Sequence, residues 1–187
     1  FAPLYVSLLL NTAPFMIYFG EEVGEAGMDE EGFSGRDGRT TIFDYWGIKS
    51  IQAWANHGKF DGAGLDEEQR TLRQFYRQLL RVARSEKAIT QGEMYDLTYA
   101  QGEGFNKHEH YAYIRKYKQH TLLVVLNFDD HLTDIQVRIP QEAFAHLLQP
   151  EYSMVEATDL LTDTTYTFPF SPHTPVCLTL PAWKGVV

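Results

Sequence analysis

The chain has 187 residues, of which 44% are hydrophobic and 22% are charged, and its formal net charge is −9. This composition is that of an ordinary globular protein with enough apolar residues for a sizeable core, and it argues against wholesale disorder. Nucleic-acid binding is not expected, because phosphates are bound by clustered basic residues and the chain has no run of Lys or Arg. The single cysteine, Cys177, cannot form an internal disulfide, and between two apolar neighbours it is typical of a small core residue. One cysteine leaves the cellular compartment open.

The first ten residues are apolar and carry neither a cationic leader nor a small-residue cleavage site. They are too few for a membrane span, which needs about 20 apolar residues, and they do not resemble a signal peptide. Leu4, Leu8 and Leu9 instead predict the end of an apolar helix. We therefore expect the natural N-terminus to lie upstream of Phe1.

An apolar stretch followed by two acidic residues is the most informative feature of the chain. Residues 15–19 read as a short strand buried on both faces, and Pro14 suits the start of such a strand. Glu21 and Glu22 then follow in a glycine-flanked turn. Acidic groups just past the C-terminal end of a strand lie where α/β barrels place their active sites. The pattern predicts that these carboxylates support a ligand cleft; the alternatives are a solvated turn or a structural bond to an arginine.

A long glycine-rich loop over residues 25–45 comes next. Loops of this length without secondary structure are uncommon inside a compact domain, and function or disorder is the usual reason for them. Tyr45 and Trp46 offer aromatic faces on which a sugar ring can stack, although a core anchor is an equally good interpretation.

Two helices are expected after the loop, a short one over residues 48–56 and a long one over residues 65–87. Asp66 and Gln69 form a plausible capping pair at the start of the long helix. Its apolar side chains recur at three- and four-residue spacing: Leu72, Phe75, Tyr76, Leu79, Val82 and Ala83. The opposite face is rich in arginine, interleaved with glutamate, and is interpreted as a solvated surface: Arg70, Arg73, Arg77, Arg81 and Arg84.

The second half of the chain consists of short β-type runs separated by turn residues, which is typical of an antiparallel sandwich. Residues 121–126 are apolar on both faces and predict the central strand, whereas residues 132–139 alternate and predict one wet face. The expected strands are residues 95–99, 111–117, 121–128, 132–139, 155–161, 164–170 and 176–180, with a short helix over residues 141–147.

The order of these pieces resembles the C-terminal third of an α-amylase-family glycoside hydrolase. The eighth barrel strand of that family reads approximately Gly-x-Pro-x-x-Tyr-x-Gly-x-Glu. Tyr18, Gly20 and Glu22 match its second half, with Pro14 one position before the motif's proline and Ala13 at its first glycine. The resemblance implies an α+β chain in which residues 1–89 are an incomplete, mainly helical (β/α)8-barrel remnant with strand 8, its active-site loop and the last helix. Residues 90–187 would then be a complete antiparallel β-sandwich domain with a structural role.

The resemblance also implies the function of the parent protein, which would cleave α-glucan or malto-oligosaccharide with retention and without a cofactor. Such hydrolysis needs two carboxyls about 5 Å apart. The family's catalytic carboxylates lie on earlier barrel strands, and adjacent residues such as Glu21 and Glu22 would point to opposite faces of an extended segment. We therefore expect no catalytic residue, no metal and no activity in this chain alone. The resemblance places the substrate-binding candidates at Glu22, Arg36, Asp37, Arg39, Tyr45 and Trp46.

Alternative interpretations remain open at this point. A carbohydrate-binding or interaction module would need exposed coplanar aromatics, for which Tyr111, Tyr113 and Tyr117 share one strand face. His108 and His110 are spaced to share one strand face, and they form either a metal site or, preferably, a pair of half-exposed sheet residues. Residues 127–130 form either a calcium loop or, preferably, a hairpin turn.

A single barrel strand cannot close a sheet by itself. Residues before about 60 are therefore expected to be partly disordered, to repack on the sandwich, or to be exchanged with a second copy in a self-association of the fragment.

Overall fold

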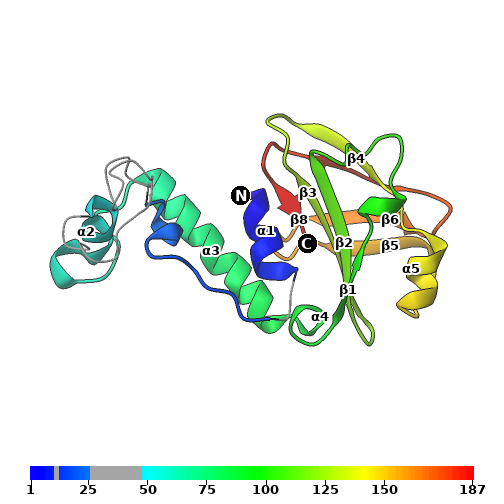
Figure 1. Ribbon diagram of the computed structural model, residues 1–187, viewed down its shortest axis with the longest axis horizontal. Coiled ribbons are helices and arrows are strands. Elements are labelled where there is room, and N and C mark those ends of the chain that lie inside the picture. The colour runs from blue at the N-terminus through cyan, green and yellow to red at the C-terminus, as the bar shows by residue number, and fades with distance from the viewer. Residues whose placement is uncertain (11–12, 26–47) are drawn as a thin grey trace, which may run out of the picture. The chain divides into compact units, whose positions relative to one another are not determined.

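The computed structural model describes residues 1–10, 13–25 and 48–187 (Figure 1). The chain divides into two compact units. Residues 15–78 form the helical unit, and residues 1–14 together with 79–187 form the sheet unit. The boundary expected near residue 90 stays a prediction. No helix in the described ranges is long and apolar enough to cross a membrane.

The helical unit contains short helical elements and most of one long helix. Its elements are η1 Glu21–Val23, α2 Lys49–Ala55, η2 Asn56–Gly58 and α3 Glu67–Ser85, whose last turns belong to the sheet unit. The capping pair of α3 is confirmed, because the Gln69 amide donates to the Asp66 carboxylate (2.8 Å) and the Asp66 amide donates to the Gln69 side chain (3.1 Å). Most of the arginine face is exposed as expected. Arg73 is an exception, since it is half-buried and its guanidinium carbon lies 5.7 Å from the centre of the Trp54 ring.

The strand expected at residues 15–19 does not form. The segment belongs to no sheet in the described part of the chain, and the Met16 side chain is 85% exposed. A strand buried on both faces requires a neighbouring strand at each edge. The described residues supply none for this segment, so the apolar run predicts a strand that this part of the chain does not complete.

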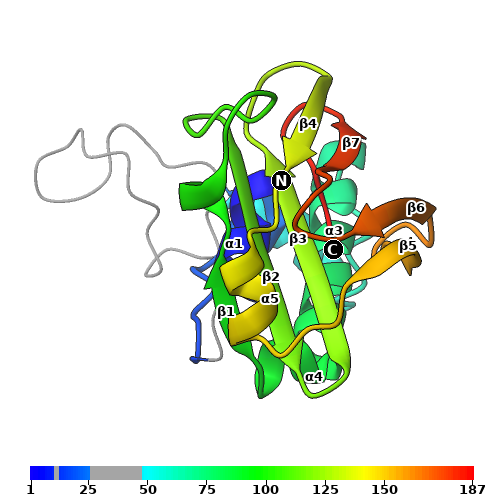
Figure 2. The same ribbon diagram turned by 90° about the vertical axis from the view of Figure 1, so that its right-hand side faces the viewer.

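The described residues of the sheet unit form one four-stranded and two two-stranded sheets, all antiparallel (Figure 2). The larger sheet has the order β1-β2-β3-β8, and the smaller ones pair β4 with β7 and β5 with β6. The strands are β1 Glu93–Asp96, β2 His110–Tyr117, β3 His120–Asn127, β4 Thr133–Val137, β5 Tyr152–Thr158, β6 Thr165–Phe170, β7 Val176–Leu180 and β8 Gly185–Val186. The helical elements are α1 Ala2–Leu9, α4 Lys87–Thr90, η3 Thr98–Ala100 and α5 Gln141–His146.

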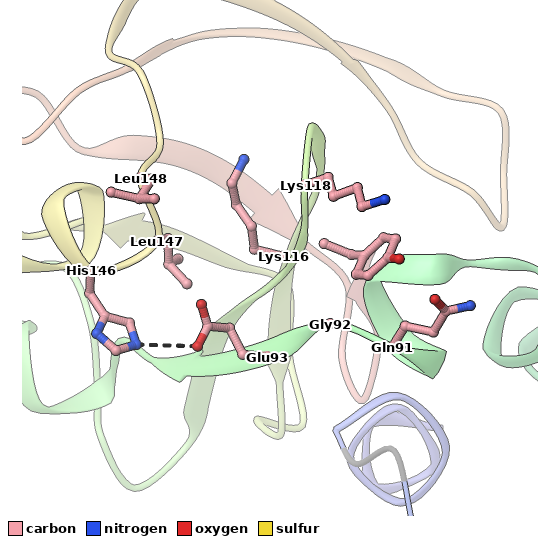
Figure 3. A pocket seen from close by; sticks show the side chains of 9 residues that line it. Gln91, Gly92, Glu93, Lys116, Lys118, His146, Leu147 and Leu148 are labelled. Atoms are coloured by element: carbon pink, nitrogen blue, oxygen red, sulfur yellow. Dashed lines mark ion pairs between the residues drawn. The ribbon is translucent and has the colours of Figure 1, made fainter.

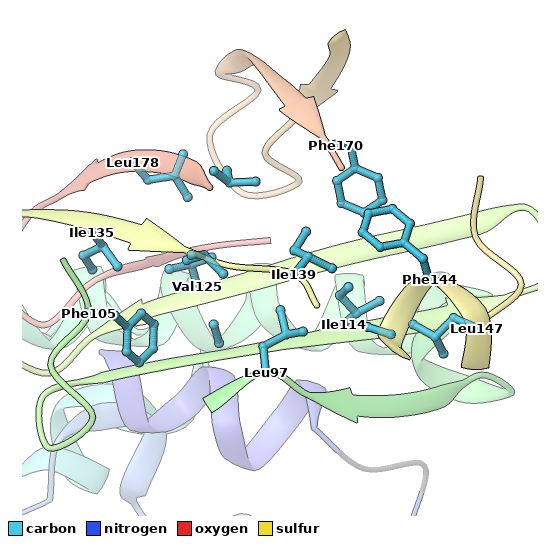
Figure 4. Close-up of a cluster of buried hydrophobic side chains, with 14 of the residues drawn as sticks. Leu97, Phe105, Ile114, Val125, Ile135, Ile139, Phe144, Leu147, Phe170 and Leu178 are labelled. Atoms are coloured by element: carbon cyan, nitrogen blue, oxygen red, sulfur yellow. The ribbon is translucent and has the colours of Figure 1, made fainter. Parts of the chain in front are cut away.

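Strand β3 is central, as its doubly apolar pattern predicts, and both of its faces are buried over residues 124–126. On one face Val125 joins a buried apolar cluster with residues of β2, β4, β7 and α5 (Figure 4). The opposite face of the sheet meets α1, because the Tyr113 hydroxyl donates to the Tyr5 carbonyl (3.2 Å) and the Tyr5 hydroxyl donates to the Gly185 carbonyl (2.8 Å). The wet face of β4 is confirmed as well: Ile135 and Val137 are fully buried and Gln136 is exposed.

Two expectations in this unit are wrong. Cys177 is exposed, because β7 alternates and places Val176 and Leu178 inside. The strand expected at residues 95–99 ends at Asp96 and is followed by the 3₁₀ turn η3. The mixed helical and antiparallel character of the chain is confirmed, whereas the barrel remnant and the complete sandwich stay predictions.

Candidate functional site

The backbone after residue 19 closes a tight acidic turn, defined here as residues 20–25. Gly20 and Gly24 both adopt left-handed conformations, with φ of 79° and 68°. The amides of Val23 and Glu25 donate to the Gly20 carbonyl at 3.1 and 3.0 Å. Val23 is 1% exposed and anchors the turn in the helical unit. The two glycines therefore supply the backbone geometry that presents Glu21, Glu22 and Glu25.

Glu21 holds the turn together. One oxygen of its carboxylate accepts the Tyr76 hydroxyl of α3, and the other accepts the backbone amide of Tyr18 at 3.0 Å. Burial raises the pKa of Tyr76, and the hydrogen bond to Glu21 raises it further. Tyr76 thus stays a neutral donor. Glu21 makes a structural hydrogen bond, as one of the alternatives expected, but its partner is a tyrosine rather than an arginine.

Glu25 is also engaged, since its carboxylate accepts the Ser50 hydroxyl of α2. Glu22 differs from both. It is half-buried, and it makes no hydrogen bond or ion pair with another described residue. Glu21 and Glu25 are both engaged by contacts within the described ranges, so Glu22 is the carboxylate of the acidic turn that remains available to bind a ligand.

The remaining binding candidates cannot be located. Arg36, Asp37, Arg39, Tyr45 and Trp46 lie outside the described residues. Their assignment to a substrate cleft, together with that of Glu22, stays a prediction.

The aromatic platform proposed for a binding module is wrong. Tyr113 is fully buried under α1, and its ring is tilted by 41° against that of Tyr111. A sugar-binding platform needs exposed rings in one plane, whereas Tyr113 donates a hydrogen bond to α1 and both Tyr111 and Tyr117 are half-buried.

The histidine pair is not a metal site. His108 is exposed and precedes β2, whereas His110 is 5% exposed and begins that strand. The Nδ1 atom of His110 accepts the Asn106 amide at 3.1 Å, which leaves the proton on Nε2, and Nε2 has no partner among the described residues. A neutral imidazole in this tautomer has no free lone pair for a metal.

The turn after β3 brings Asp129, Asp130 and His131 together. Their ligand atoms all lie within 4.8 Å of one another. The Nδ1 atom of His131 lies 2.7 Å from the Asp129 carboxylate and 2.9 Å from that of Asp130, and the hydrogen bond to Asp130 raises the pKa of His131. The histidine thus satisfies both carboxylates. The hairpin turn expected here is wrong, because β3 pairs with β2 and β8 whereas β4 pairs with β7, so this turn connects strands of two different sheets.

Replacing Gly20 with alanine is expected to destabilise the chain by about 2–4 kcal/mol, because the left-handed backbone and a steric clash act together. A Cβ atom at this position would lie 2.7 Å from the Glu25 Cβ. Gly58→Ala is the matched control, since Gly58 has a similar φ of 85° and no atom within 4 Å of the added Cβ. The control should cost about 1 kcal/mol, the backbone contribution alone. Urea unfolding monitored by tryptophan fluorescence measures the free energy of unfolding of both variants. Equal losses of stability would show that movement of the turn relieves the clash.

Sequence reasoning missed Tyr76 and Ser50 as partners of the acidic turn. Tyr76 was expected only as part of the apolar stripe of α3. A tyrosine in an apolar stripe carries a hydroxyl that needs a partner when buried, which was the available signal. Ser50 gave no such signal, because short polar residues in helices are usually solvated.

No protein-family model matches the chain, and a search of curated proteins found no relative. Solved structures of enzymes of the α-amylase family do match it. AmyP in complex with maltose is 17% identical with a TM-score of 0.60, and the match covers 99% of this chain and 33% of AmyP. Trehalulose synthase MutB from Pseudomonas mesoacidophila is 16% identical with a TM-score of 0.52, over 99% of this chain and 37% of that enzyme. An isomaltulose synthase variant from Erwinia rhapontici in complex with D-glucose is 16% identical with a TM-score of 0.54, and the match covers 98% of this chain and 36% of that enzyme.

These matches confirm the resemblance at the level of the fold. The chain spans about a third of the length of the enzymes it matches, as expected for a C-terminal part. At such low identity the likeness concerns the fold alone.

Proposed function

We propose that the chain is the C-terminal part of an α-glucan-active glycoside hydrolase that acts with retention. The observation that carries the proposal is the match of 99% of the chain to AmyP structures, one of which contains maltose and another maltotriose. Residues 1–89 complete the catalytic barrel of the parent enzyme, and residues 90–187 form a structural sandwich domain that packs on it. The ligand of the parent is α-glucan or a malto-oligosaccharide.

The chemistry of the reaction resides outside this chain. Retaining hydrolysis requires a nucleophilic carboxylate and an acid about 5 Å apart. Glu21 and Glu25 are committed to Tyr76 and Ser50, so the acidic turn does not offer such a pair. Glu22 supports the glucan cleft by accepting hydrogen bonds from sugar hydroxyls or from neighbouring cleft residues, and it performs no covalent step.

The test is to sequence the coding DNA upstream of Phe1 and to compare the longer protein with this chain on maltotriose. We expect upstream strand–helix units with an Asn-His-Asp motif, hydrolysis by the longer protein, and none by the chain alone. In the longer protein Glu22→Gln should weaken maltotriose binding several-fold, whereas Glu68→Gln on the exposed face of α3 should not. Translation that begins at this chain, or hydrolysis by the chain itself, would refute the proposal.

A further inference from the structure

A pocket of about 360 Å³ opens in the sheet unit, where the edge of the large sheet meets the end of α5 (Figure 3). Its volume falls within the range of small-molecule sites. The pocket belongs entirely to residues of β1, β2 and α5 and their neighbours, so it is separate from the acidic turn of the helical unit.

Lys116 on β2 is the unusual member of this pocket. It is 8% exposed, and its ammonium donates to the Thr121 hydroxyl at 3.0 Å and to the Gln149 side-chain oxygen at 2.6 Å. Both partners are neutral. Glu93 is the cross-strand neighbour of Lys116, but no carboxylate within the described ranges forms an ion pair with the Lys116 ammonium. Burial lowers the pKa of Lys116. Burying a charge without a counter-charge is unfavourable, and a lysine retained in this situation needs a reason.

A structural role does not account for the lysine. The Thr121 hydroxyl donates to Gln149 directly, at 2.7 Å, so these two groups satisfy each other without Lys116. An ammonium has three N–H donors, and acceptors among the described residues use two of them. One donor and the whole positive charge remain for a bound group.

The other lining residues favour an anion with an organic body. Lys118 adds a second cation, and its ammonium nitrogen lies 5.2 Å from the centre of the Tyr117 ring. In Figure 3 the Lys116 side chain extends between the side chains of Leu148 and Lys118. Glu93 is the carboxylate in the lining, and it lies 3.4 Å from Nε2 of His146. Leu148 is 87% exposed in a left-handed backbone conformation, φ 48°, which places a large apolar side chain at the pocket for a ligand to cover.

We propose that this pocket binds a small organic oxyanion, a phosphate monoester or a carboxylate, with the Lys116 ammonium as its counter-charge. Lys118 adds long-range attraction, Leu148 covers the apolar part of the ligand, and the exposed Gln91 amide donates at the rim. The site is independent of the proposed hydrolase function, since it uses no residue of the acidic turn.

The test is isothermal titration calorimetry of the 187-residue chain with glucose 6-phosphate, gluconate and glucose. We expect the two anions to bind and glucose not to bind; the tighter of the two identifies the oxyanion. Lys116→Met should weaken anion binding about 10- to 100-fold, the usual effect of losing a charge-assisted hydrogen bond. Lys107→Met, an exposed lysine outside the pocket, should leave it unchanged. Equal binding of glucose, or equal affinity of the Lys116 variant and the parent chain, would overturn the proposal.

Two further readouts keep the proposal testable whatever the Lys116 variant does to folding. Without ligand, Lys116→Met should melt at the same temperature as the parent chain or higher, because it removes an unpaired buried charge, and glucose 6-phosphate should raise the melting temperature of the parent chain only. Glu93→Gln changes a half-exposed side chain, so it should fold normally. Glu93→Gln should strengthen anion binding two- to threefold, because it removes a negative charge that repels the bound anion. Unchanged or weaker binding by this variant would count against the site.

Discussion

Replacing Arg115 with methionine is expected to lower the free energy of unfolding by about 3–5 kcal/mol, because several buried carbonyls lose their donor at once. Arg115 is 2% exposed, and its guanidinium donates to the backbone carbonyls of Leu10, Ala88, Ile89 and Gly92 at 2.5 to 3.0 Å. These carbonyls lie at the C-terminal ends of α1 and α4, where a positive charge is favourable. Methionine keeps an apolar stem but has no donor, so the backbone carbonyls at these helix ends would be buried without a hydrogen-bond partner.

Urea unfolding at neutral pH measures this loss, and Arg81→Met on the exposed face of α3 is the control, with an expected change within about 0.5 kcal/mol. Arg115→Lys should fall between the two, since an ammonium keeps the charge but cannot reach four carbonyls in the plane of a guanidinium. A loss below about 1 kcal/mol for the methionine variant would mean that water enters and satisfies the carbonyls.

Replacing Asn127 with aspartate is expected to cost about 2–4 kcal/mol at neutral pH, although the two side chains have the same shape. Asn127 is fully buried, and its amide nitrogen donates to the carbonyls of His131, Leu180 and Pro181 at 3.0 to 3.1 Å. Its oxygen accepts the Asp129 amide at 2.9 Å. A carboxylate keeps the acceptor, but it faces three carbonyl oxygens with a negative charge instead of a donor.

The loss of stability in Asn127→Asp should depend on pH and should be larger at neutral than at acidic pH. Burial among carbonyls raises the pKa of the introduced carboxyl above its unfolded value of about 3.9. The variant is therefore least destabilised below pH about 4, where the carboxyl is protonated and donates, and the deficit grows as pH rises through the raised folded pKa. Urea midpoints of variant and parent at pH 4 and pH 7 check this. Gln136→Glu, an equal charge change at an exposed position of β4, should show no such trend; a pH-independent loss for the aspartate variant would contradict the explanation.

Much of the secondary structure of the described residues was predictable from the sequence, because it follows from local patterns. Alternation of apolar and polar residues predicts β4 and its wet face, and the capping pair Asp66 and Gln69 predicts the start of α3. The doubly apolar run at residues 121–126 predicts a strand covered on both faces, and β3 is buried on both faces over residues 124–126. These signals depend only on residues within a few positions of one another.

Residues 15–19 show where such patterns are insufficient. Their composition is that of a buried strand, yet Met16 is exposed and the segment joins no sheet of the described residues. Composition indicates what a strand would bury, but pairing requires a partner at its edge. Most of the candidate cleft, from Arg36 to Trp46, lies outside the described residues, and of the acidic turn the sequence predicted the carboxylates but not their partners.

The sequence by itself thus determined the order and type of most elements and the resemblance to an amylase-family fold, since these follow from periodicity, turn residues and motif order. Only the tertiary structure decided which polar groups satisfy one another. Arg115 finds the Leu10 carbonyl 105 positions earlier, the Glu21 carboxylate accepts a hydroxyl 55 positions away, and Lys116 is buried without a counter-charge. The reason is physical: burial makes every unpaired donor, acceptor or charge costly, and the partner that removes the cost is chosen by the packing of distant elements.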